Sequence, residues 1–254
     1  MIDGPNGPGA PPPGRWTRRR LLAAGAGLMA TGVAAEDLVK SNARLAQEHL
    51  ARRLPEIRNA LATAPPGFTL LAGNSHAEIV GTALARSRPV INAGIGGTSA
   101  RGYAAQIDAM PFVTRAGTAL LFLGTNDILR RADPLSPATL GGFEAAASRI
   151  LDWLRSRADR VLVAAVPPLG PEAAVLRDPA AVDAYSAALR GLCERSGCRY
   201  FDPFAGLRDS GAGLTTRAAP PDGVHLRDYD ALVTELAGLL SADSPARPPD
   251  QVRP

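Results

Sequence analysis

The chain has 254 residues, of which 46% are hydrophobic and 20% are charged, as in an ordinary globular protein with a sizeable core. Its formal charge of +4 arises mainly in residues 1–35, which hold four arginines and one aspartate, so the remainder keeps 24 basic (28 − 4) and 23 acidic (24 − 1) side chains. This nearly neutral body excludes the polybasic surface that nucleic-acid-binding proteins use.

The N-terminal segment, residues 1–35, has the features of an export signal. Residues 1–14 are rich in proline and glycine, which predicts disorder. The run TRRRLL at Thr17–Leu22 resembles the twin-arginine export motif, and the apolar stretch Leu21–Ala35 is shorter than the about 20 residues of a membrane span. Small residues before Glu36 suit cleavage by a signal peptidase. The sequence therefore predicts a periplasmic or secreted protein, with an uncleaved membrane anchor as the alternative.

Residues 36–241 are expected to form one domain in which helices and strands alternate. Helical spacing of leucines predicts a helix over residues 37–62, which Pro55 should kink or divide. Beyond it, short unbroken apolar runs separated by amphipathic stretches are typical of a mostly parallel sheet with helices on both faces. The expected strands are 68–72, 90–93, 119–123, 161–166 and 200–201, and the expected helices are 76–86, 99–108, 138–157, 179–195 and 226–240. The proline-rich residues 242–254 are expected to be a disordered tail.

Ligands of parallel sheets bind beyond the carboxyl ends of the strands, so the segments that follow the strands are the place to look for a site. Four such segments carry polar or glycine residues: Gly73–His76, Gly94–Thr98, Gly124–Asp127 and Asp222–His225. All four are expected at the same edge of the sheet.

Two of these segments supply a nucleophile and a base. Ser75 lies between a strand and a helix, so its backbone N–H should point toward a developing anion. His225 follows Asp222 by three residues, and a catalytic histidine needs a carboxylate on one ring nitrogen and the nucleophile on the other. Taken singly, Ser75 could be a helix cap, His225 a histidine at the start of a helix, and Asp222 a turn residue.

The other two segments offer donors for an oxyanion. Gly97 presents a backbone N–H that no side chain blocks, and Asn126 presents a side-chain amide. Taken singly, they are a glycine turn and an Asn-Asp turn. Together with Ser75, whose N–H is a third donor, they predict an oxyanion hole and hence acyl transfer to a serine.

Four sequence blocks resemble the SGNH (GDSL-type) hydrolase family. The blocks are LLAGNSHAE, VINAGIGGTS, LLFLGTNDI and PPDGVHL, in the family's order over residues 68–229. The resemblance implies a three-layer α/β/α sandwich with a flavodoxin-like parallel sheet of strand order 2-1-3-4-5. It implies Ser75 as the nucleophile, His225 as the base, Asp222 as its orienter, and Gly97 and Asn126 as oxyanion donors. It implies neither a metal nor an organic cofactor.

Members of this family hydrolyse carboxylic esters or thioesters or remove acetyl groups from sugars, and some relatives transfer acyl groups. The sequence is thus interpreted as an exported serine esterase that forms an acyl-enzyme on an ester of, for example, a carbohydrate or lipid. The alternative is an extracytoplasmic O-acyltransferase or a non-catalytic binding protein on the same scaffold. The expected partners are the ester substrate and the twin-arginine export machinery, without nucleic acid. The substrate-binding residues, the acyl chain and the oligomeric state are left open.

Three other patterns suggest different chemistry. The run GIGGTS half-matches a dinucleotide-binding fingerprint, but Ser99 replaces the third glycine and no acidic residue ends a strand about 20 positions later. GNSHA half-matches the nucleophile elbow of α/β-hydrolases, but Ala77 replaces the last glycine. Cys193 and Cys198 lack a second ligand pair for zinc, so they are either two buried thiols or a local disulfide.

Several residues near the motifs are expected to support the site without reacting. His76 competes with His225 for the role of base, but it is expected to line a pocket or begin a helix. Asp127 should hold the loop that presents Asn126. Asn74 stands where the family pattern has an aspartate, so it keeps part of the hydrogen bonding without the charge. His49, on the first helix, is expected at the surface.

Overall fold

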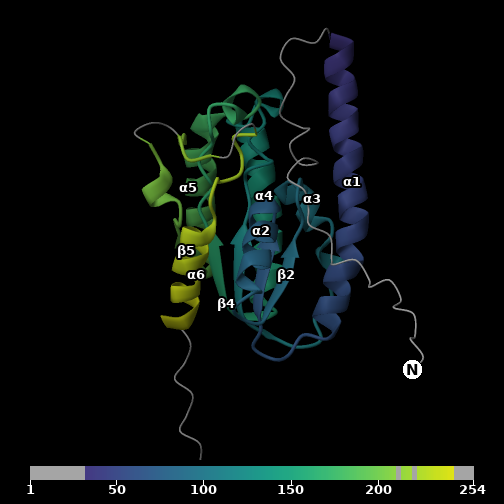
Figure 1. Cartoon of the computed structure of the whole chain (residues 1–254), viewed down its shortest axis with the longest axis vertical. Coiled ribbons are helices and arrows are strands. Elements are labelled where there is room, and N and C mark those ends of the chain that lie inside the picture. The colour runs from purple at the N-terminus through teal and green to yellow at the C-terminus, as the bar shows by residue number, and fades with distance from the viewer. Residues whose placement is uncertain (1–31, 210–212, 219–221, 243–254) are drawn as a thin grey trace, which may run out of the picture.

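The computed structural model of the chain describes residues 32–209, 213–218 and 222–242 (Figure 1). The twin-arginine motif and residues 243–254 of the expected tail lie outside the described residues. Within the described part of the chain, no helix is both long enough and apolar enough to cross a membrane.

Five parallel strands form one sheet in the order β2-β1-β3-β4-β5. The strands are β1 (Thr69–Gly73), β2 (Val90–Gly94), β3 (Ala116–Phe122), β4 (Ala158–Ala164) and β5 (Arg199–Phe201). In the central register, Leu70 lies opposite Ile91 of β2 on one side and Ala119 of β3 on the other. The predicted flavodoxin-like strand order is confirmed. The strand order reverses between β1 and β3, which places a crevice beyond their carboxyl ends.

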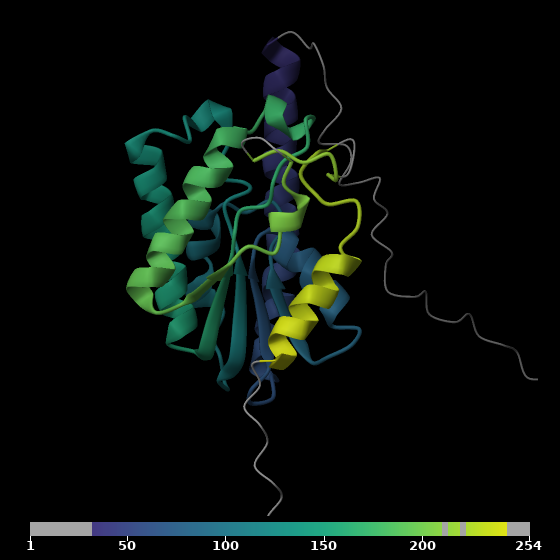
Figure 2. The same cartoon turned by 90° about the vertical axis from the view of Figure 1, so that its left-hand side faces the viewer.

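Helices cover both faces of the sheet and complete the predicted α/β/α sandwich. The helices are α1 (Gly32–Ala62), α2 (Ser75–Leu84), α3 (Ala100–Ala104), α4 (Pro137–Arg155), α5 (Pro179–Ser196) and α6 (Asp230–Ala242). One hydrophobic cluster joins the sheet to α1, α3, α4 and α5, and the other joins it to α2 and α6. Seen edge-on, α4 and α5 lie on one side of the sheet and α6 on the other (Figure 2).

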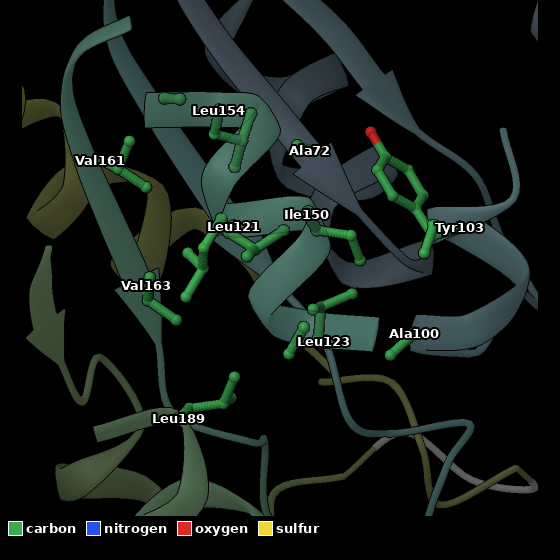
Figure 3. Packing of buried hydrophobic residues seen from close by; sticks show 14 of the residues in the cluster. Ala72, Ala100, Tyr103, Leu121, Leu123, Ile150, Leu154, Val161, Val163 and Leu189 are labelled. Atoms are coloured by element: carbon green, nitrogen blue, oxygen red, sulfur yellow. The ribbon is translucent and has the colours of Figure 1, made fainter. Parts of the chain in front are cut away.

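The side chains of consecutive strand residues pack on opposite faces of the sheet. Leu121 and Val163 pack in the same cluster as Ile150 and Leu154 of α4 (Figure 3), whereas Leu120 belongs to the cluster with α2 and α6. All five side chains are essentially inaccessible to solvent. Burial of each such side chain contributes about 1.5–3 kcal/mol, so both faces of the sheet demand apolar residues. This is why the strands have unbroken apolar sequences.

Three of the helices differ notably from expectation. The first helix runs without interruption through Pro55, so the expected division of that helix is wrong. The last helix begins at Asp230 and not at Leu226, and the Asp228 carboxylate accepts the backbone N–H of Asp230 (2.8 Å) just before the helix. The expected helix over residues 99–108 is the short α3 followed by a separate 3-10 turn.

The two cysteines lie where α5 ends. Gly197 adopts a left-handed conformation (φ 71°) that stops the helix, and the backbone N–H of Cys198 donates to the carbonyl of Cys193 (3.1 Å). Both cysteines are free, the Ser196 hydroxyl donates to the Cys198 thiol (3.3 Å), and the interaction with the neighbouring Cys193 thiol lowers the pKa of Cys198. The local disulfide that the sequence left open is therefore not formed in this structure.

Candidate active site

A sharp turn after β1 places Ser75 at the first position of α2. Gly73 has a φ of 120°, and a side chain there would overlap the carbonyl oxygen of Phe122 on β3. Asn74 then caps the helix, because its Oδ1 accepts the backbone N–H of His76 (3.0 Å). Among the described residues, the backbone N–H of Ser75 has no protein acceptor. It is an open donor at the positive end of the helix dipole.

Ser75, His225 and Asp222 form one hydrogen-bonded chain. His225 Nε2 lies 2.9 Å from Ser75 Oγ, and His225 Nδ1 lies 2.8 Å from Asp222 Oδ2. The second carboxylate oxygen of Asp222 accepts the backbone N–H groups of Val224 (2.8 Å) and His225 (3.1 Å). The turn Asp222–His225 therefore holds the carboxylate and the ring in fixed relation to each other. The structure thus brings together all three residues of the predicted triad.

The environment of Asp222 keeps its carboxylate ionised. Burial alone would raise the pKa of Asp222, but hydrogen bonds from the His225 ring and from two backbone N–H groups lower it. An ionised carboxylate accepts the Nδ1–H of the neutral ring, so Nε2 is left as the acceptor that faces the serine hydroxyl. This tautomer is inferred from the hydrogen bonds.

Gly97 and Asn126 carry N–H groups in the loops that follow β2 and β3, the strands on either side of β1. Gly97 has a φ of 79°, a left-handed conformation that favours glycine, and its backbone N–H has no acceptor among the described residues. Asn126 donates one Nδ2 hydrogen to the carbonyl of Thr98 (3.0 Å) and keeps the second available. Asn126 is thereby joined to the loop that carries Gly97, as an oxyanion hole built from both residues requires.

Arg177 is a site residue that the sequence reasoning missed. Its Nε donates to the carbonyl of Thr125 (2.9 Å), and its Nη2 donates to Oδ1 of Asn126 (3.2 Å). It lies 51 positions after Asn126 in a loop between β4 and α5. No motif marks this residue, so nothing in the sequence would have identified it.

Asp127 connects the end of β3 to the start of α3. Its two carboxylate oxygens accept the backbone N–H of Ala100, at 2.9 and 3.1 Å. Burial raises the pKa of Asp127 to about 6, although this hydrogen bond acts in the opposite direction. The contact fits the expected supporting role, since it fixes the loop on which Asn126 lies.

The other two histidines lie near the site but do not touch the serine hydroxyl. His76 is fully buried, its Nδ1 lies 2.9 Å from the Tyr229 hydroxyl, and burial lowers its pKa. His49 was expected at the surface, and that expectation is wrong: its side chain is only 14% exposed. Its Nε2 lies 2.8 Å from Glu78 Oε2, which also accepts the backbone N–H of Gly96 (2.8 Å). His49 of α1 is therefore directed at the loop that carries Gly97 and not at solvent.

Comparison with known proteins finds a family model that spans the region of the four sequence blocks. The model of the GDSL-like Lipase/Acylhydrolase family matches residues 62–229, more than half of the chain. No curated protein matches the chain significantly.

Among the described residues, no group of three or more histidine, cysteine, aspartate or glutamate side chains is placed to hold a metal ion.

Several solved structures share the fold. A protein from Streptococcus pneumonia whose description names platelet activating factor is 17% identical, with a TM-score of 0.67, over 83% of this chain and 100% of that one. A GDSL-like lipase from Bacteroides thetaiotaomicron is 15% identical, with a TM-score of 0.59, over 75% of this chain and 97% of that one. The acetylxylan esterase Axe2 from Geobacillus stearothermophilus is 17% identical, with a TM-score of 0.52, over 73% and 97%.

Proposed function

Because the chain belongs to the GDSL-like lipase/acylhydrolase family and is thus a hydrolase of ester bonds, we propose that it cleaves carboxylic esters through an acyl-enzyme on Ser75. The observation that carries this proposal is the continuous hydrogen-bonded chain from Ser75 Oγ through the His225 ring to the Asp222 carboxylate, with distances of 2.9 and 2.8 Å. A serine hydroxyl becomes a strong nucleophile only when a base accepts its proton.

Each group has one task in the proposed reaction. Ser75 Oγ attacks the ester carbonyl while His225 Nε2 takes the hydroxyl proton, and the Asp222 carboxylate stabilises the imidazolium that forms. The N–H groups of Ser75, Gly97 and Asn126 stabilise the negative charge on the carbonyl oxygen. His225 then gives its proton to the leaving alcohol, and a water molecule activated by the same ring releases the acid and frees the serine.

We further propose that the enzyme is exported and acts in the periplasm or outside the cell. The run TRRRLL and the apolar stretch behind it support this localisation, and the twin-arginine export machinery is the partner that they imply. For the substrate, a small acyl group is the natural first choice, since acetyl esters are what the name of the structural relative Axe2 specifies.

The test uses the purified protein with a fluorophosphonate probe and p-nitrophenyl acetate. We expect the wild-type protein to be labelled at Ser75 and to hydrolyse the ester, and Ser75→Ala to lose labelling and roughly 10⁴-fold or more in turnover. Ser241→Ala is the matched control, because that hydroxyl lies on α6 and donates to the carbonyl of Ala237. Turnover that survives in Ser75→Ala would contradict the mechanism. Labelling without hydrolysis of any ester would favour acyl transfer instead.

A further inference from the structure

We propose that Arg177 is a positioning residue of this enzyme, which holds the amide of Asn126 in the one orientation that lets it donate to the oxyanion. The inference rests on the proposed function, because the orientation of Asn126 matters to the rate only where an oxyanion forms. Four features of the structure support it: where Arg177 is anchored, what its guanidinium contacts, which way the amide must face, and the charge that Arg177 brings.

The loop that carries Arg177 is fixed against the segment that follows Asn126. Backbone N–H groups connect the two in both directions, from Arg130 to the carbonyl of Leu176 (3.0 Å) and from Asp178 to the carbonyl of Ile128 (2.9 Å). These two hydrogen bonds fix the backbone of Arg177 relative to the segment that follows β3. The Arg177 side chain therefore extends to Asn126 from a fixed position.

The guanidinium contacts two consecutive residues at the end of β3. Nε donates to the carbonyl of Thr125 (2.9 Å), and Nη2 donates to Oδ1 of Asn126 (3.2 Å). These two nitrogens lie on one edge of the planar group, so both bonds form only when the guanidinium lies alongside this segment. A lysine ammonium, a single point on a flexible stem, does not reproduce that pair of contacts.

The donor-only chemistry of arginine decides which way the Asn126 amide faces. A guanidinium carries five N–H donors and no acceptor, so the atom opposite Nη2 must be the amide oxygen. The Nδ2 group then faces the carbonyl of Thr98 (3.0 Å) with one hydrogen and has the second free for the oxyanion. A flipped amide would set N–H against N–H at Arg177 and oxygen against oxygen at Thr98. Arg177 thus excludes the orientation in which Asn126 repels the oxyanion.

The positive charge of Arg177 lies next to the amide oxygen of Asn126. Burial lowers the pKa of this guanidinium and the nearby Asp222 carboxylate raises it, and arginine stays protonated in proteins. A cation bonded to the amide oxygen of Asn126 polarises the amide and strengthens its N–H donor, an effect that is larger in a site of low dielectric constant. Since charge develops on the substrate oxygen mainly in the transition state, the benefit should appear in kcat.

The test compares Arg177→Gln with the wild type and with Arg130→Gln. We expect Arg177→Gln to lower kcat about tenfold and to leave KM within about twofold. The kcat of Arg177→Lys should lie between those of the wild type and Arg177→Gln. Arg130 is the matched control, because it donates to the carbonyl of Ala174 (3.0 Å) in the same loop and pairs with Asp178, with no contact to Asn126. Its replacement should leave kcat unchanged.

A double-mutant cycle separates positioning from general support of the fold. Asn126→Ala should lower kcat about 100-fold, and in that background Arg177→Gln should cost less than about a further twofold. A tenfold loss in both backgrounds would overturn the inference, because Arg177 would then act without Asn126. If Arg177→Gln does not fold, the same cycle is run with Arg177→Lys. Failure of the wild-type protein to label at Ser75 would refute the proposed function itself, a result distinct from an additive cycle.

Discussion

Asparagine at position 74 leaves a polar group without a partner beside the nucleophile. The side chain is 1% exposed, and while Oδ1 caps α2, Nδ2 has no hydrogen-bond partner among the described residues. A buried donor without an acceptor costs about 1–3 kcal/mol. An aspartate would remove that donor, keep the acceptor for the His76 N–H, and place a negative charge at a helix N-terminus, where it is favourable.

We therefore expect Asn74→Asp to retain or raise esterase activity. The measurement is kcat/KM on p-nitrophenyl acetate at neutral pH. Asn74→Ala serves as the comparison, since it deletes the cap altogether and should reduce the free energy of unfolding by about 1 kcal/mol. A loss of more than about tenfold in Asn74→Asp, equivalent to 1.4 kcal/mol in the activation barrier, would show that Nδ2 makes a contact needed during the reaction.

Sequence reasoning could name residues whose position follows from a strand end, and also Asp222 and His225, which their spacing of three residues marks. Ser75 and Asn126 come directly after β1 and β3, so the fold rule alone brings them to one crevice, where the structure places them. Arg177 could not be found this way, because its contact with Asn126 depends on the path of a loop and not on any repeat or motif. The prediction for His49 was wrong for a related reason. A polar residue on an amphipathic helix is expected to face solvent, and the contact of His49 with Glu78 cannot be read from the sequence.

At the scale of elements, the order and type of strands and helices were predictable, whereas their ends were not. The apolar runs that form β1 to β4 reflect burial on both faces, which the sequence records directly. Ends depend on single hydrogen bonds that the sequence does not reveal. β4 stops at Ala164, and beyond it the N–H of Val166 is bonded to the Ser186 hydroxyl (3.1 Å) on α5 and not to a strand.

Helix α1 and helix α2 are linked through Glu78 to the loop that carries Gly97. Glu78 Oε2 accepts both the His49 ring N–H and the backbone N–H of Gly96, and Arg53 lies 3.7 Å from the other carboxylate oxygen. Burial alone would raise the pKa of Glu78, but the hydrogen bond from His49, the charge of Arg53 and the Gly96 N–H lower it. An ionised Glu78 thus fixes the Gly96-Gly97 turn relative to α2, whose first residue is the nucleophile.

We expect Glu78→Ala to lower kcat about tenfold and the free energy of unfolding by about 1–3 kcal/mol, because it leaves the Gly96 N–H without an acceptor. Glu78→Gln keeps one acceptor oxygen and should lose less of both. Glu48→Ala is the control, since Glu48 lies on α1 with its side chain 59% exposed. The measurements are steady-state kinetics and urea unfolding. Equal activity in Glu78→Ala and Glu48→Ala would show that the reaction does not depend on the bond between Glu78 and the loop that carries Gly97.

For the whole molecule, the carboxylates around the site make stability depend on pH in two opposite senses. The pKa values of Asp222 and Glu78 are lowered in the folded state, so the stability they contribute is present above their unfolded pKa and is lost as the pH falls through the folded values. Asp127 differs: burial raises its pKa from 3.8 to about 6. Its folded state holds a proton that the unfolded chain has released, so stability falls as the pH rises from about 4 to about 6.

These two windows allow the contribution of Asp127 to be isolated. We expect the free energy of unfolding of the wild type, minus that of Asp127→Asn, to decrease by about 2 kcal/mol between pH 4 and pH 7, since a pKa difference of one unit corresponds to about 1.4 kcal/mol and partial exposure reduces the effect. Asparagine retains an acceptor for the Ala100 N–H, so the variant should fold.

Urea unfolding across this range measures the difference. Below pH 4 both proteins should lose stability in parallel, because Asp222 and Glu78 are intact in each. A difference that stays constant from pH 4 to pH 7 would mean that Asp127 ionises as readily in the folded molecule as in the unfolded chain, and that the loop presenting Asn126 is more open to water than its burial in this structure implies.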